Sequence, residues 1–300
     1  MSPQVENTSL HAGSVIDLAS AAGFVRRAPC RVPGKSAGSG SPHSMRPLLL
    51  LAAALLTAAC GKPPAAGKVE EKKAAAPLPV EYFHVDAATA GAVAGTIAFA
   101  GPKPARQAIS MAADEGCQTA HAGKPAYDEA LLVGKNGRLA NAFVYIQSGL
   151  EGKKFEPNTE AVVLDQRGCM FVPRVIGIRP GQILDLNNGD AVAHNVHPLP
   201  LNNREWNQEQ APQAPTVQHR FARPEIMIPV KCNIHAWMHS YIGVVDHPYF
   251  AVTGPDGTFQ WKNVPPGDYT VAVWHEKLGK LEQPLHVAPS ANAAVNFTYR

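Results

Sequence analysis

From Gly91 onward the sequence alternates apolar and polar residues in short runs, and no long stretch shows the 3.6-residue apolar period of an amphipathic helix. The runs are rich in Val, Ile, Leu and Phe, and turn residues such as Gly101-Pro102 and Asn187-Asn188-Gly189-Asp190 bound them. Many short strands at this spacing are typical of a β-sandwich. We therefore expect an all-β fold, with strands at Ala92–Phe99, Ala130–Val133, Ala140–Gln147, Ala161–Leu164, Val175–Ile178, Gln182–Leu186, Thr216–Phe221 and Glu225–Val230.

After about Asp246 the same texture repeats on a smaller scale, with strands expected at Tyr249–Val252, Thr258–Trp261, Thr270–Trp274, Leu285–Val287 and Ala294–Tyr299. The stretch 258–274, in which a Pro-Pro-Gly-Asp-Tyr turn feeds a strand, resembles the carboxypeptidase regulatory-like domain, a small β-sandwich with mostly structural or adhesive roles. Residues 247–300 are few for a complete sandwich, and the strand near Gly95–Phe99 is expected to complete it. His275 and Glu276 are expected to be surface polar residues.

The clearest targeting signal is residues 45–59, which run from Met45-Arg46 through an apolar stretch to small residues before Cys60. The apolar run is too short for a transmembrane helix and fits a secretory signal peptide. Its Leu-Thr-Ala-Ala-Cys ending resembles the lipobox of bacterial lipoproteins, which implies lipidation at Cys60 and a membrane-anchored protein of the periplasm or cell envelope. Ordinary signal cleavage, with Cys60 incidental, is the alternative.

Composition divides the rest of the chain into an N-terminal extension, a tether and two folded domains. Residues 1–44 precede the signal peptide and show no periodicity. They indicate either an over-extended reading of the gene, with the true start at Met45, or a disordered extension that forms an unusually long n-region of the signal. Residues 60–90 are rich in Pro, Ala, Lys and Glu and indicate a flexible tether. We expect a first β domain over 91–246 and a small second β-sandwich over 247–300.

The net charge of +3 does not indicate an anionic partner. Five of the 27 basic and two of the 24 acidic residues lie in 1–59, so 60–300 carries 22 of each. The expected mature chain is therefore neutral, which argues against nucleic acid as a partner.

Three cysteines follow the lipobox-like cysteine: Cys117, Cys169 and Cys232. In an oxidising compartment exposed free thiols are liabilities, and Cys117 and Cys169 each follow a polar turn, so we expect them to form a disulfide. Cys232 is then single, and a bound metal is one reason for a single cysteine.

Cys232 opens the pattern Cys232-x2-His235-x2-Met238, directly after an apolar strand, and His194-Asn195 lies upstream. A thiolate, two imidazoles and a thioether form the ligand set of a blue-copper electron-transfer site. In these motifs the chain resembles the cupredoxins, such as plastocyanin and amicyanin. That resemblance implies a Greek-key sandwich and one type 1 copper ion held by His194, Cys232, His235 and Met238. It also implies that Asn195 supports the cysteine sulfur or the ligand loop.

The sequence does not decide the roles of several nearby residues, and other interpretations of the motif remain. His197 competes with His194, but the two point to opposite faces of a strand. His239 could make a weaker metal contact or be exposed, and Trp237 could lie at a docking face or plug the core. Rival interpretations are a structural zinc site, a Cys–His nucleophile, and a buried Cys and Met with incidental histidines. Haem attachment is excluded, because the motif has only one cysteine.

The function expected from these features is single-electron transfer by a membrane-tethered copper protein that is not an enzyme. Its partner would be a redox protein such as a c-type cytochrome or an envelope oxidoreductase. Copper storage or delivery is one alternative, although only six Met occur in the chain. An adhesive or carbohydrate-binding β-sandwich protein is the other.

Overall fold

The computed structural model describes residues 80–300. The predicted extension 1–44, the signal peptide 45–59, the lipidation site Cys60 and most of the tether 60–90 lie outside the described residues. At the end of the expected tether, Phe83 packs edge-on against Phe155, with ring centroids 5.6 Å apart. None of the helices within 80–300 is long and apolar enough to cross a membrane.

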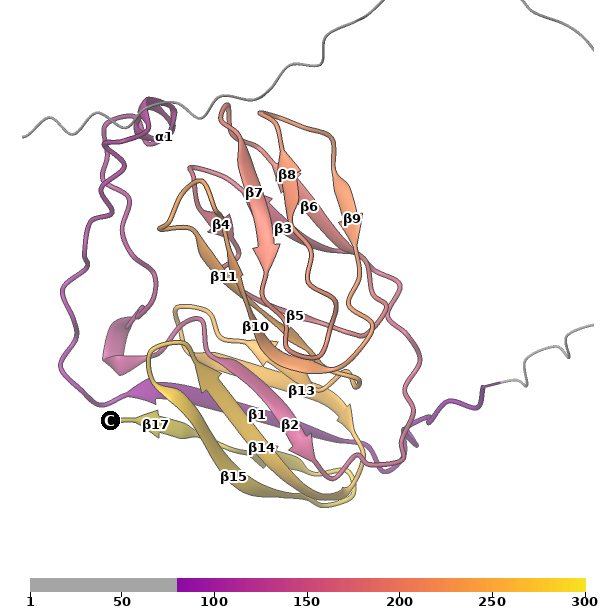
Figure 1. Cartoon of the computed structure of the whole chain (residues 1–300). Coiled ribbons are helices and arrows are strands. Elements are labelled where there is room, and N and C mark those ends of the chain that lie inside the picture. The colour runs from indigo at the N-terminus through magenta and orange to yellow at the C-terminus, as the bar shows by residue number, and fades with distance from the viewer. Residues whose placement is uncertain (1–79) are drawn as a thin grey trace, which may run out of the picture. The chain divides into compact units, whose positions relative to one another are not determined.

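Almost all the regular secondary structure of the described chain is β-strand, as its alternating pattern predicts (Figure 1). What we call the larger module pairs a five-stranded sheet with a four-stranded sheet. The five-stranded sheet has the order β5 (Val175–Ile178), β11 (His239–Val244), β10 (Glu225–Lys231), β7 (His194–Pro198), β8 (Gln208–Gln210). The four-stranded sheet has the order β4 (Phe171–Val172), β3 (Val162–Gln166), β6 (Leu184–Asn188), β9 (Val217–His219).

What we call the smaller module is a second sandwich of two four-stranded sheets. One sheet contains β13 (Thr258–Val264), β1 (Gly91–Phe99) and β16 (Asn292–Ala294), with β17 (Phe297–Tyr299) also paired to β1. The other has the order β12 (Phe250–Val252), β2 (Phe143–Ser148), β14 (Gly267–His275), β15 (Gly279–Val287). The short helix α1 (Glu115–Ala120) and the 3-10 turn η1 (Lys135–Gly137) lie between β1 and β2 in the chain.

The two modules interleave along the chain, whereas the sequence predicted one domain after another. Strand β1 completes the smaller module, as expected, but β2 also belongs to it, because β2 pairs with both β12 and β14. The expected strand Ala130–Val133 is absent from the described fold. There Val133 makes only an isolated bridge to Leu139, because the chain reverses at once through η1.

The modules pack through a pair of glycines. Gly177 on β5 faces Gly243 on β11 in register. A Cβ at Gly177 would lie 2.3 Å from the Phe250 ring, and one at Gly243 would lie 2.5 Å from the Phe143 ring. The absence of side chains at these two positions therefore lets aromatic rings of the smaller module lie directly on the backbone of the larger one.

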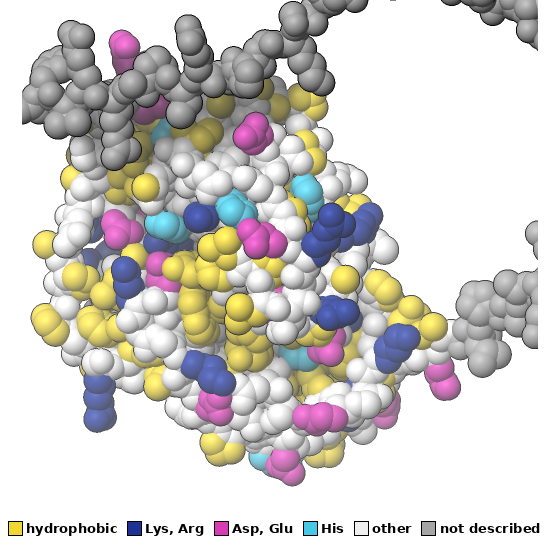
Figure 2. All heavy atoms as spheres, viewed as in Figure 1, with side chains coloured by type: hydrophobic (Ala, Val, Ile, Leu, Met, Phe, Trp, Pro, Cys, Tyr) yellow, Lys and Arg dark blue, Asp and Glu magenta, His cyan; other side chains and the backbone are white. Residues whose placement is uncertain are grey.

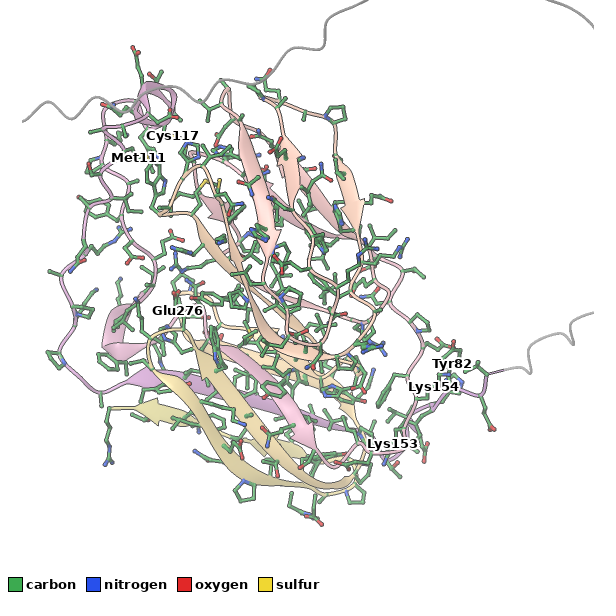
Figure 3. All side chains as sticks on the ribbon, in the orientation of Figure 1. Tyr82, Met111, Cys117, Lys153, Lys154 and Glu276 are labelled. Atoms are coloured by element: carbon green, nitrogen blue, oxygen red, sulfur yellow. A yellow bond between two sulfur atoms is a disulfide. The ribbon has the colours of Figure 1, made fainter. Side chains whose placement is uncertain are left out.

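A buried ion pair also joins the modules. Arg174, directly before β5, binds Glu276 at the end of β14 through two hydrogen bonds, one of 2.9 Å. The two side chains are only 5% and 6% exposed, and His275 beside them is 1% exposed. The expectation that His275 and Glu276 are surface residues was therefore wrong, because β14 ends inside the junction and not at solvent. Figure 3 shows Glu276 at this place.

Charged side chains are mixed on the surface. On the face shown in Figure 2, basic and acidic groups are interspersed among apolar ones and form no large patch of one sign. This distribution agrees with the balance of 22 basic and 22 acidic residues over 60–300.

We predict that Glu276→Gln destabilises the fold by about 3 kcal/mol, since breaking a buried pair leaves a buried charge uncompensated. The loss of stability should lie at the low end of the range for buried ion pairs, because Asp128, 3.7 Å from Arg174, still compensates part of its charge. Urea-induced unfolding measures the free energy of unfolding of the variant and of the wild type. The control is Glu282→Gln, which removes an exposed partner of Lys280 and should leave the midpoint unchanged. Equal midpoints for both variants would contradict a stabilising role for the junction pair.

Candidate metal centre

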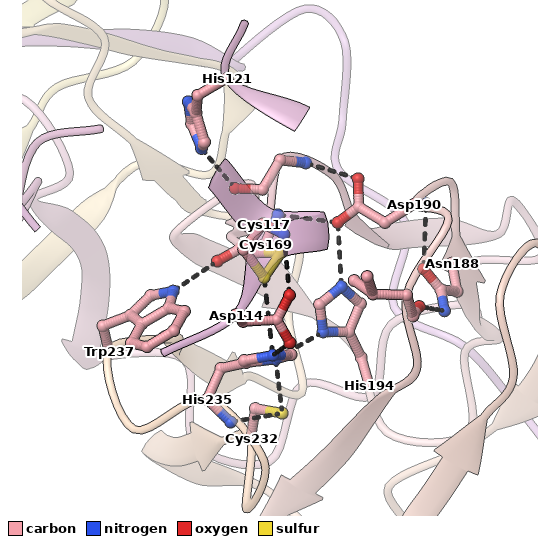
Figure 4. The surroundings of a disulfide bond; sticks show 12 residues. Asp114, Cys117, His121, Cys169, Asn188, Asp190, His194, Cys232, His235 and Trp237 are labelled. Atoms are coloured by element: carbon pink, nitrogen blue, oxygen red, sulfur yellow. Dashed lines mark hydrogen bonds and ion pairs between the residues drawn. A yellow bond between two sulfur atoms is a disulfide. The ribbon is translucent and has the colours of Figure 1, made fainter. Parts of the chain in front are cut away.

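Three of the four sequence-predicted ligands, His194, Cys232 and His235, meet at one end of the larger module (Figure 4). His194 is the first residue of β7 and is fully buried. Cys232, His235 and Met238 lie on the hairpin loop between β10 and β11, whose last paired residues are Lys231 and His239. Because β7 pairs with β10 beside this loop, the topology brings His194 to residues about 40 positions later in the chain.

Backbone hydrogen bonds hold the hairpin loop in a compact shape. The His235 N–H points at Cys232 Sγ at 3.4 Å, and the Met238 N–H donates to the His235 carbonyl at 3.0 Å. The Cys232 N–H closes the loop by donating to the Met238 carbonyl at 3.3 Å. Cys232 and Met238 are both buried in the apolar core of the module.

Asn195 connects the first strand to this loop. Its Oδ1 accepts the Asn233 backbone N–H at 2.7 Å and lies 3.4 Å from Cys232 Sγ. Its Nδ2 donates to Asn207 Oδ1 at 2.6 Å, which fixes the amide orientation. The side chain therefore holds the cysteine end of the loop against β7.

Three donor atoms converge inside this frame. The Nδ1 atoms of His194 and His235 lie 2.9 Å apart, and His235 Nδ1 lies 3.9 Å from Cys232 Sγ. Ligand atoms of these three buried residues all lie within 4.8 Å of one another. Ligands about 2.0–2.3 Å from one ion lie at comparable separations, so the three residues fit a metal ion.

Each histidine also binds a carboxylate through its outer nitrogen, which the sequence did not predict. Asp190 Oδ2 lies 2.9 Å from His194 Nε2, and Asp114 Oδ2 lies 3.1 Å from His235 Nε2. Such partners fix the ring orientation and leave Nδ1 free to face the donor cluster. Asp190 is four residues before His194, a spacing that could have been noticed, whereas no local signal connects Asp114 to a residue 121 positions away.

Electrostatics favour an ionised cysteine. Burial by itself raises the pKa of the Cys232 thiol, but hydrogen bonding to His194 and to backbone amides outweighs it and lowers the pKa from 9.0 to about 6. Burial lowers the pKa of His194, yet Asp190 and Cys232 raise it by more. Thiolate is the form that binds metals.

The disulfide lies against the same cluster. Cys117 and Cys169 are bonded, and Cys117 Sγ is 3.5 Å from His235 Nε2. Asp114 caps α1 by accepting the Cys117 N–H at 2.9 Å, and Asp190 accepts the Cys169 N–H at 2.7 Å. The two carboxylates that hold the histidines thus also hold the two half-cystines.

The remaining candidate residues lie outside the donor cluster. His197 binds Glu205 at 2.7 Å and Asn233 at 3.1 Å, on the other face of β7 from His194. His239 is exposed. Trp237 is partly buried: its ring lies 5.0 Å from the His235 ring, and its N–H donates to the Cys169 carbonyl at 3.0 Å. It thus packs between the loop and the disulfide.

Comparison with known proteins gives only partial similarity. No family model and no curated protein matches the chain. Among solved structures, the copper-containing nitrite reductase NirK from Thermus scotoductus SA-01 is 19% identical with a TM-score of 0.27, over 34% of this chain and 25% of that one. This chain thus spans a quarter of the length of that enzyme.

Smaller copper proteins match over most of their own length. The purple cupredoxin from Nitrosopumilus maritimus is 17% identical with a TM-score of 0.24, over 28% of this chain and 98% of that one. A mutant of amicyanin in its reduced state is 17% identical with a TM-score of 0.26, over 34% of this chain and 98% of that one. At these low scores the similarity supports no conclusion about function. Any functional conclusion has to come from the geometry of the site.

We predict that Cys232 in the metal-free protein is half ionised at about pH 6 and a thiolate above it. Asp190→Asn should raise this pKa toward 9, because it removes the charge that stabilises protonated His194 beside the sulfur. Ultraviolet absorbance of the thiolate across a pH titration, corrected with Cys232→Ser, measures the shift. Glu205→Gln, beside the outlying His197, is the control. An unchanged pKa in Asp190→Asn would refute this coupling.

Proposed function

We propose that the protein is a type 1 copper protein that carries single electrons in the bacterial cell envelope while tethered to a membrane. The observation that carries this proposal is the buried cluster of one thiol and two imidazoles, with a buried methionine on the same loop. With Met238 as a weak fourth donor, this set would suit copper better than zinc, because it would combine soft and borderline ligands with a thioether. Copper held by such a set cycles between Cu(I) and Cu(II) and so exchanges one electron at a time.

The chain's own residues would keep the centre rigid during this cycle. Asn195 anchors the start of the loop, the carbonyls of His235 and Met238 are bonded within it, and the carboxylates fix both imidazoles. His194 and His235 are 0% and 3% exposed, so water is excluded from the donors. Because these hydrogen bonds hold both imidazoles and the loop in place, little reorganisation would accompany the gain or loss of an electron.

Location and partners belong to the same proposal. The signal-like segment 45–59 with Cys60 supports export and a lipid anchor, and the composition of 61–79 supports a tether. A redox protein, such as a c-type cytochrome or an envelope oxidoreductase, would supply or remove the electron. We propose an electron carrier and not an enzyme, because the buried donors would leave a bound ion no open position for a substrate.

Copper holding and delivery is a second candidate. It is favoured by the cover over His235, whose outer nitrogen contacts Asp114 and the disulfide and is not open to solvent. An electron-transfer protein needs one metal ligand close to its surface, where a redox partner can dock. A copper-storage protein retains its ion better when all the ligands are buried. The two candidates differ in the spectrum and in the oxidation state that the bound metal adopts.

We predict that the copper-loaded protein binds one ion per chain and shows an intense visible band from the cysteine–copper bond. Cys232→Ser should abolish the band, because the thiolate is its source. His197→Ala is the matched control, since it removes a nearby histidine outside the donor cluster and should keep both copper and colour. Metal analysis and visible spectroscopy on the three proteins measure this.

Two results would decide against electron transfer. Stoichiometric binding of Cu(I) without colour and without reversible oxidation would favour holding or delivery. An absence of copper binding, with Cys232→Ser behaving as wild type throughout, would refute a copper role and favour an adhesive β-sandwich protein.

A further inference from the structure

The imidazole of His235 lies between two sets of donor atoms. Its Nδ1 faces inward, 2.9 Å from His194 Nδ1 and 3.9 Å from Cys232 Sγ. Its Nε2 faces outward, 3.5 Å from Cys117 Sγ and 3.1 Å from Asp114 (Figure 4). One ring therefore separates the candidate centre from the disulfide.

The outer set has the composition of a metal site of its own. Ligand atoms of Cys117, Cys169 and His235 lie within 4.8 Å of one another, and all three residues are buried. Two thiolates and an imidazole form a soft donor set of the kind that binds Cu(I) or zinc, and Cu(I) is the ion that also suits the inner donors. While the disulfide is intact the sulfurs are not thiolates, so this set can bind metal only in the reduced chain.

An ion cannot reach the inner donors of the described fold without movement of the chain. His194, Cys232 and Met238 are at most 3% exposed, and His235 is covered by the segment that carries Asp114 and Cys117. This segment contains only the six-residue helix α1, and short isolated helices are marginal. The disulfide is the covalent link between this segment and Cys169, across 52 residues of sequence, and a contact of 2.7 Å between His121 Nε2 and the Gly168 carbonyl lies beside it. Reduction of the disulfide would therefore both create the outer donors and loosen the cover.

We propose that Cys117 and Cys169, in their reduced form, make with His235 an entry site for Cu(I), through which the ion passes to His194 and Cys232 before the disulfide closes. This inference rests on the proposed function for the identity of the metal and for its final site at His194 and Cys232, whereas the outer donors Cys117 and Cys169 are independent of it.

The chemistry of this sequence balances. The chain is made with free thiols, and binding of Cu(I) by Cys117 and Cys169 releases their two protons. After the ion has moved inward, one thiolate attacks the disulfide of a thiol–disulfide exchange protein and forms a mixed disulfide. The second thiolate then displaces that protein, which carries away two electrons and takes up two protons from water to become a dithiol. The new Cys117–Cys169 bond closes the route behind the ion.

The first experiment isolates the entry site by removing the inner thiolate. Full-length Cys232→Ser is prepared without oxygen in dithiol-reduced and disulfide forms, the reductant is removed, and each form competes with a coloured Cu(I) chelator. We expect the reduced form to withdraw one Cu(I) per chain. The disulfide form and the triple variant C117S/C169S/C232S should bind more weakly by at least roughly 100-fold, since even outer partners of a metal site contribute about 10–100-fold. Circular dichroism checks that the variants fold.

The second experiment separates a thiolate site from a merely loosened cover. With Cys232 intact, the rate of Cu(I) uptake is compared for the reduced wild type, the disulfide wild type and the double variant C117S/C169S. In this variant the cover is untied but the donor sulfurs are absent. We expect fast uptake only in the reduced wild type.

Three results would overturn the proposal. Equal Cu(I) affinity of reduced C232S and the triple variant would show that there is no entry site. Uptake by C117S/C169S as fast as by the reduced wild type would show that loosening alone is sufficient. Equal uptake by the two wild-type forms would show that the disulfide does not close the route. A colourless wild type that nevertheless passes both experiments would refute electron transfer and leave the entry site standing.

Discussion

A closed ring of polar contacts inside the larger module holds the candidate centre together. His194 binds Asp190, Asp190 holds Cys169, the disulfide joins Cys169 to Cys117, Asp114 caps Cys117, and Asp114 returns to His235, whose Nδ1 contacts His194. Because most of these groups are buried, each would be costly without a partner, and each supplies the partner of the next. Removal of one side chain from this ring therefore leaves each of its neighbours as a polar group that lacks one of its partners. This mutual dependence explains why α1, the strand β7 and the hairpin loop occupy fixed positions around one small volume.

The apolar layers of the fold keep this ring away from water. The sheets of the larger module enclose a core that contains Cys232, Met238 and the disulfide, while a separate core fills the smaller module. A third cluster, with Phe143 and Met227, joins the two modules. Gly177 and Gly243 let the two modules approach closely, and the Arg174–Glu276 ion pair links them at the same junction. The smaller module thus covers the sheet face opposite the core that holds the centre, so apolar contacts support β5 and β11 from outside.

Much of the fold was predictable because strands buried on one face produce a two-residue period in the sequence. Strand β6, Leu184–Asn188, alternates buried and partly exposed residues along its whole length, and the expected run 182–186 overlapped it. The same reasoning failed where the contacts are not local. Ala130–Val133 has strand-like residues but no partner strand, and β2 pairs with strands more than 100 residues later. The helix α1 is too short to show a period and depends on its Asp114 cap and on the disulfide.

For the site, the sequence alone indicated which groups could hold a metal ion. A cysteine, a histidine and a methionine at three-residue spacing on one loop indicated a metal, because local spacing decides which donors a tight hairpin can bring together. Tertiary structure alone decided what surrounds them. Asp114 and Asp190, the position of the disulfide at 3.5 Å from His235, and the burial of His275 and Glu276 depend on segments that meet only when the sheets pack. The physical reason is that short-range patterns follow from backbone geometry, whereas the pairing of buried charges depends on the whole fold, in which every buried polar group must find its partner.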